Sequence, residues 1–191
     1  MIMNDSVNEE IISQWFPELA WIGDGQLRSK CIKAFEDAFR QGGWTVETAD
    51  KLFVSVMRVN TPHLKSYIAH VRAVTQTAAG IYDSLEKTYD NYTNLRDTVI
   101  AGALLHDIGK PLEFTLSTEG VLCYADNAKI MRHPLSGSIL AAKNGLPDEV
   151  IHIIAVHSVE GEQSYKTLAA QIVCAADEIA FRFLLAFDEI Q

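Results

Sequence analysis

The sequence predicts an all-α fold, a helical bundle that carries one small β-hairpin. Apolar residues recur at three- and four-residue spacing along most of the chain, and glycines, prolines and capping residues separate these segments. Residues 113–124 differ, because two short runs of strand-forming residues flank a turn that contains Gly120. With 191 residues, 48% of them hydrophobic, the chain is long enough for one domain with a substantial core.

The N-terminal third is expected to contribute short helices. Ser6 followed by Glu9 has the pattern of a capping box and predicts a helix that ends near Phe16. A second helix is expected from Leu27 until Gly42-Gly43, and Thr45 is expected to cap a third. Residues 1–60 are too few to hold much core alone, so we expect a helical cap on a core at 61–187, within one domain spanning 1–191.

The rest of the chain predicts longer helices. Thr61-Pro62 has the cap and first-turn proline of the longest one, whose apolar positions continue to Leu85. Residues 95–106 form the next expected helix, and a helix is expected from Pro134 until Gly145. Two further helices are expected, one at 147–157 and one from about residue 164 almost to residue 191.

Composition excludes several classes of protein. The formal net charge of −9 argues against strong non-specific binding to nucleic acid, which requires clustered Lys and Arg. The first residues lack the pattern of a signal peptide, and no run approaches the ~18 apolar residues of a membrane span. Three scattered cysteines are typical of reduced thiols, so we expect a cytoplasmic protein.

The stretch Ala101–Pro111 carries the first chemical signal. An apolar helical run ends in His106 and Asp107, and glycine and proline then stop the helix. Imidazole and carboxylate groups together suit a hard or borderline divalent metal.

Further histidines and acids lie in other apolar helices or at their ends, where a bundle would build a site in its core. The candidate metal ligands are His70, His106, Asp107, His133, His157 and Asp177. Asp177 is the most informative, because it interrupts a largely apolar helical face and a buried unpaired carboxylate costs several kcal/mol. A cation would offset that cost.

The ligand order His, His-Asp, His, His, Asp resembles that of the HD-domain superfamily of metal-dependent phosphohydrolases. The motif His-Asp-Ile-Gly-Lys-Pro at 106–111, the hairpin after it and His133-Pro-x-x-Gly137 carry this resemblance, which covers residues 61–183. It implies an HD-type helical bundle with two divalent metal ions, such as iron or manganese. By this resemblance His70, His106, Asp107 and Asp177 would bind one ion, and His133 and His157 would bind the second, with Asp107 as the bridge.

The resemblance also implies hydrolysis of a phosphomonoester or phosphodiester by metal-bound hydroxide, with a small phosphorylated compound, a nucleotide in the first instance, as substrate. Asp107 and Lys110 are the expected catalytic residues. Lys110, Arg132 and His63 are candidates for contact with the substrate. Each also has a simpler interpretation: Lys110 would favour a helix dipole, and Arg132 and His63 would be solvated at the surface.

Two other functions are compatible with the same ligand order. One is a di-iron oxygenase of the HD type, which would need oxygen for turnover. The other is a nucleotide-binding regulatory module that retains a structural metal and binds without turnover.

Overall fold

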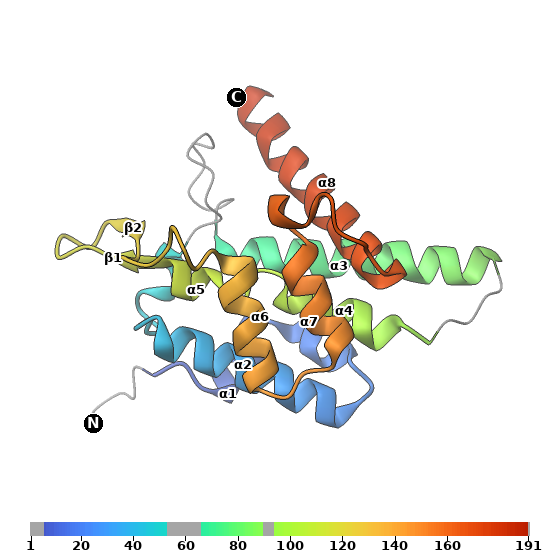
Figure 1. Ribbon diagram of the computed structural model, residues 1–191, viewed down its shortest axis with the longest axis horizontal. Coiled ribbons are helices and arrows are strands. Elements are labelled where there is room, and N and C mark those ends of the chain that lie inside the picture. Colours follow the sequence, from blue (N-terminus) through green and yellow to red (C-terminus); the bar gives the residue numbers. More distant parts are fainter. Residues whose placement is uncertain (1–5, 53–65, 90–93, 191) are drawn as a thin grey trace.

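The computed structural model describes residues 6–52, 66–89 and 94–190. Within these ranges it has the predicted all-α architecture, helices with one two-stranded antiparallel hairpin (Figure 1). No helix in these ranges combines the length and the apolar character that crossing a membrane requires.

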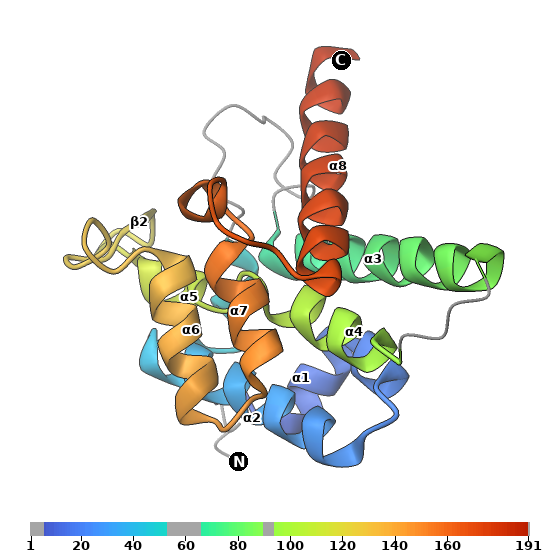
Figure 2. The same ribbon diagram turned by 45° about the vertical axis from the view of Figure 1, so that its right-hand side comes forward.

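Helix α4 (Arg96–Leu105) is the centre of the bundle. Its residues from Val99 to Leu105 are all buried, because α3 (Tyr67–Tyr89), α7 (Asp148–Val156) and α8 (Leu168–Ile190) all pack against it. Helix α8 crosses α3, and its C-terminal half then projects away from the bundle (Figure 2). The C-terminal end of α4 therefore lies where the surrounding helices meet.

The N-terminal elements close one side of this core. They are α1 (Glu9–Trp15), the 3-10 helix η1 (Pro17–Trp21), α2 (Gly25–Gln41) and the 3-10 helix η2 (Ala49–Lys51). Phe16 stacks on Phe35 with a centroid distance of 4.4 Å, and Tyr67 of α3 meets Phe16 and Phe39 edge-on. The cap expected for this segment therefore shares a buried cluster with the rest of the chain.

The predicted start of α1 is wrong in detail. Its cap is Asn8, whose Oδ1 accepts a hydrogen bond from Ile11 N at 3.1 Å, whereas Ser6 forms an isolated β-bridge with Thr45. Thr48, not Thr45, is the N-cap of the 3-10 helix Ala49–Lys51 that follows.

Three expectations fall wholly or partly outside the described residues. These are the continuation of the third N-terminal helix and the Thr61-Pro62 helix start, together with the boundary between cap and core at 60–61. At its other end α3 continues beyond Leu85 to Tyr89. There the Tyr82 hydroxyl lies 2.6 Å from Glu86 Oε1 and accepts from Leu95 N, which stabilises the additional turn.

The segment after α4 forms α5 (Lys110–Glu113), β1 (Phe114–Leu116) and β2 (Leu122–Tyr124), followed by α6 (His133–Lys143). The hairpin pairs Phe114 with Tyr124, and Gly120 adopts a φ of 74° in its turn, as the sequence predicted.

Close approach between the turn after α4 and the start of α6 requires a glycine. A Cβ at Gly109 would lie 2.1 Å from the carbonyl oxygen of His133 and 2.8 Å from Gly137 N. The missing side chain lets the two segments touch, which brings Asp107 next to His133.

Substitution Gly109→Ala should therefore lower the free energy of unfolding by about 1–3 kcal/mol through overpacking. Gly80→Ala is the matched control, because a Cβ there meets nothing within 4 Å and alanine is the better helix former by about 1 kcal/mol. Urea unfolding of both variants checks this. Equal stability of Gly109→Ala and the wild type would contradict the close approach.

Candidate metal centre

The six predicted metal ligands come together at one place. His70 lies in α3, His106 and Asp107 follow the end of α4, and His133 begins α6. His157 follows α7, and Asp177 lies in α8. Their potential ligand atoms form two groups, each within 4.8 Å, one of His70, His106 and Asp177 and the other of Asp107, His133 and His157.

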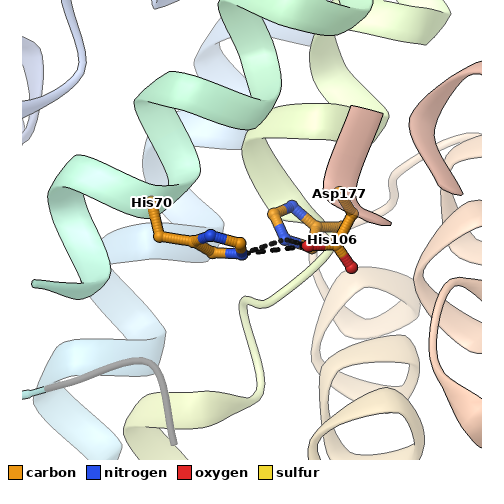
Figure 3. A group of neighbouring side chains, drawn as sticks. All are labelled: His70, His106 and Asp177. Carbon is orange, nitrogen blue, oxygen red and sulfur yellow. Dashed lines mark hydrogen bonds and ion pairs between the residues drawn. The ribbon is translucent and has the colours of Figure 1, made fainter. Parts of the chain in front are cut away.

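In the first group the side chains point toward one another from three helices or helix ends (Figure 3). His70 Nε2 lies 3.2 Å from His106 Nε2 and 3.1 Å from Asp177 Oδ1. The distance from His106 Nε2 to Asp177 Oδ1 is 3.8 Å.

Asp107 lies between the two groups. Its Oδ1 is 3.3 Å from Nε2 of both His133 and His157. Its Oδ2 is 3.5 Å from His70 Nε2 and 3.4 Å from His106 Nε2. One carboxylate thus presents one oxygen to each group, as a bridging ligand would.

The hydrogen bonds of the imidazoles indicate which nitrogen is free. Nδ1 of His106 lies 2.7 Å from Ala103 O, and Nδ1 of His157 lies 2.8 Å from Ile154 O. A carbonyl oxygen accepts only, so both Nδ1 atoms donate, and in a neutral ring Nε2 then carries a lone pair. His133 Nδ1 lies 2.6 Å from the carboxylate oxygen Oε2 of Glu113, so it also donates and leaves the lone pair on Nε2.

The donor set fits divalent cations. The Nε2 lone pairs of His106, His133 and His157 and the carboxylate oxygens of Asp107 and Asp177, all acceptors, face one another at 3.3–3.8 Å. Such a cluster needs positive charge between its members, and nitrogen and oxygen ligands suit iron, manganese or zinc. Each ion would have ligands from at least three elements of the fold.

Charge interactions keep both aspartates ionised, and although burial opposes a charged His106 imidazole, Asp107 raises the pKa of that ring. Burial opposes the Asp107 carboxylate, but Lys110 and His106 hold its pKa well below the usual range. Burial likewise opposes the Asp177 carboxylate, but the hydrogen bond from His70 lowers its pKa to about 2. Burial also lowers the pKa of His70 and of His133, so both rings are neutral at neutral pH.

The centre opens into a cavity of about 470 Å³ that contains cationic side chains. Lys110 begins α5, directly after the turn at 106–109, and its Nζ lies 2.9 Å from Asp107 Oδ2. Arg132 lines the same cavity while its guanidinium bonds Glu113 and Glu160, so its contact with substrate stays a prediction. His63 lies outside the described residues.

Sequence reasoning missed Glu113 and Lys166. Glu113 is buried and bonds both His133 and Arg132, although its place before a hairpin gave no sign of burial. Lys166 lines the cavity and donates to Gly161 O, but its sequence context is an ordinary loop.

Comparison with known proteins gives two findings. The family model "HD domain" matches residues 67–182, which is more than half of the chain. A "Dihydroneopterin 2',3'-cyclic phosphate phosphodiesterase" of Methanocaldococcus jannaschii is 32% identical over 160 residues. The match covers 82% of this chain but 64% of that relative's length. No solved structure matches the chain significantly.

Substitution Asp107→Asn should reduce the number of bound cations below two, because Asp107 serves both groups. Asp177→Asn, which changes one group, should retain the cation of the other. Metal content per chain after loading with Mn²⁺ and gel filtration measures both. Two cations retained by Asp107→Asn would contradict its bridging position.

Substitution Glu113→Gln should weaken Mn²⁺ binding about 10- to 100-fold, because the amide holds the His133 ring less firmly than the carboxylate. Glu160→Gln is the matched control, since Glu160 bonds Arg132 but not His133. Calorimetric titration with Mn²⁺ compares the two variants. An equal loss in both would assign the effect to Arg132 instead.

Proposed function

The chain belongs to the HD domain family, and from that premise we propose that it is a metal-dependent phosphohydrolase acting on a small phosphorylated compound. One observation carries the proposal: four histidines and two aspartates converge at a cavity that also contains Lys110, Arg132 and Lys166. Cationic side chains beside a metal centre suit a phosphoryl group, which carries negative charge on its non-bridging oxygens.

The finer proposal is hydrolysis of a cyclic phosphodiester on the side chain of a heterocycle. The M. jannaschii relative is named as an enzyme of this kind, and its resemblance to this chain supports the choice. In the reaction a water oxygen bonds to phosphorus while one ester P–O bond breaks. The departing alkoxide takes a proton, and the product is a phosphomonoester.

The side chains have distinct roles in this proposal. Two bound cations would lower the pKa of a coordinated water and neutralise charge on the phosphoryl oxygens. Asp107 holds the two halves of the centre together, and the Nδ1 hydrogen bonds keep the Nε2 atoms directed inward. The ammonium of Lys110 stabilises negative charge that develops on the phosphoryl group.

The two alternatives have less support. A di-iron oxygenase would use the same ligands, but the relative named as a phosphodiesterase favours hydrolysis. A regulatory module without turnover would not need the complete donor set that the structure brings together.

The test is turnover without oxygen. The Mn²⁺-loaded protein is given dihydroneopterin 2',3'-cyclic phosphate, adenosine 2',3'-cyclic phosphate and adenosine 5'-phosphate under nitrogen, and ³¹P NMR follows the products. We expect a phosphomonoester from a cyclic substrate, and none after EDTA or in Asp107→Ala. Turnover that requires oxygen would establish the oxygenase, and binding without turnover would establish the regulatory module.

Substitution Lys110→Met should lower kcat about 10²- to 10³-fold, the cost of losing one group that stabilises transition-state charge. Metal content should stay unchanged, because Lys110 supplies no ligand atom. Lys129→Met, outside the cavity lining, is the control. An unchanged kcat in Lys110→Met would remove Lys110 from the proposed mechanism.

A further inference from the structure

A second cavity, open to solvent, adjoins the metal centre between α3 and α8, and Ala69, Ala73, Ile179 and Phe183 in its lining are exposed. Its volume is about 390 Å³, within the range of small-molecule sites. Its lining consists of Ala69, His70, Ala73, Thr77, Ile179, Ala180, Phe183 and Leu184. His70 lines this cavity and the metal cavity alike, so the two spaces are neighbours.

The two cavities differ in chemistry. Charged and metal-ligating side chains dominate the first, whereas the second has alkyl groups, one aromatic ring, the Thr77 hydroxyl and the His70 ring. A phosphate would find no cationic side chain in the lining of the second cavity, whereas a flat heteroaromatic ring would gain apolar contact.

On both α3 and α8, residues that line the apolar cavity lie on the same helix face as the candidate metal ligand. On α3, Ala73 and Thr77 lie three and seven residues after His70. On α8, Ala180 and Leu184 lie three and seven residues after Asp177. Residues at these spacings share a helix face, so both helices lead from the metal centre into the apolar cavity.

We propose that this apolar cavity binds the heteroaromatic ring of the substrate while its phosphate lies at the metal centre. The inference rests on the proposed function, because it assumes a phosphorylated substrate. A compound with a short chain between a bicyclic ring and a phosphate would reach both cavities past His70. The Thr77 hydroxyl is a polar group at which a ring nitrogen or carbonyl can bond.

Small side chains keep this cavity open. Ala69 and Ala73 form its wall on α3, and Ala180 contributes from α8. Leucine at position 73 would project into the space that the ring needs, while the ligand atoms of His70 and Asp177 stay as they are.

The experiment compares two substrates with the same five-membered cyclic phosphate. One is dihydroneopterin 2',3'-cyclic phosphate, and the other is glycerol 1,2-cyclic phosphate, which has no ring system to bind. Ala73→Leu should lower kcat/KM about 10- to 100-fold for the pterin, mainly through KM. It should change kcat/KM for the glycerol compound by less than about twofold. Ala142→Leu, on the exposed side of α6, should change neither.

Binding of the ring is measured separately with neopterin, which has no phosphate. Its fluorescence should report binding to the wild type, and Ala73→Leu should abolish that binding. Should Ala73→Leu fail to fold, Thr77→Leu fills the same cavity one turn further along α3.

The outcomes separate this inference from the proposed function. The wild type could cleave neither cyclic phosphate and still bind neopterin, with Ala73→Leu abolishing that binding. This result would overturn the proposed hydrolase function but support the ring-binding site. Turnover with equal effects of Ala73→Leu on both substrates, or neopterin binding that Ala73→Leu leaves intact, would overturn the ring site.

Discussion

The buried carboxylate of Asp107 is the constraint on which the rest of this structure depends. Four imidazole nitrogens and the Lys110 ammonium lie within 3.5 Å of its two oxygens. Burying an anion is costly unless positive charge offsets it, and the Nε2 lone pairs of His106, His133 and His157 beside it call for that same positive charge, so the helices that supply these groups must all reach one point. The contact of Gly109 with the start of α6 follows from the same requirement, because it brings His133 to Asp107.

Helix ends orient two of the four imidazole rings. His106 and His157 each follow the last residue of a helix, and each donates Nδ1–H to a carbonyl three residues earlier. The last carbonyls of a helix have no intrahelical partner, so one hydrogen bond satisfies the helix end and selects the tautomer of a ligand. His133 begins its helix, so no helix-end carbonyl precedes it, and its Nδ1 bonds the Glu113 carboxylate instead. His70 lies within a helix whose carbonyls are already bonded, and its Nδ1 has no hydrogen-bond partner in the described part of the chain.

Features set by local sequence could be predicted, whereas features set by packing between distant segments could not. The metal ligands stand out because histidine and aspartate interrupt apolar helical periodicity, and the order of helices, hairpin and turns follows from glycine, proline and spacing. Glu113 could not be found in this way, because its burial comes from the packing of α5 against α6. The α1 cap predicted at Ser6 lies instead at Asn8, whose amide oxygen accepts from Ile11 N, and local spacing does not distinguish two capping residues two positions apart.

The apolar cavity was equally hidden from the sequence, because alanines at a helix surface look the same whether they face solvent or a neighbouring helix. In our proposal these alanines belong to a ring-binding wall that is separate from the metal centre. The candidate ligand atoms tolerate little change, since the imidazoles of His106, His133 and His157 are each oriented by a hydrogen bond at Nδ1. The wall at Ala73, Thr77 and Ala180 touches none of those hydrogen bonds, so its size can change while the metal centre stays intact. Under this proposal, selection among phosphorylated ring compounds would be set by this wall, one helical turn away from the candidate metal ligands His70 and Asp177.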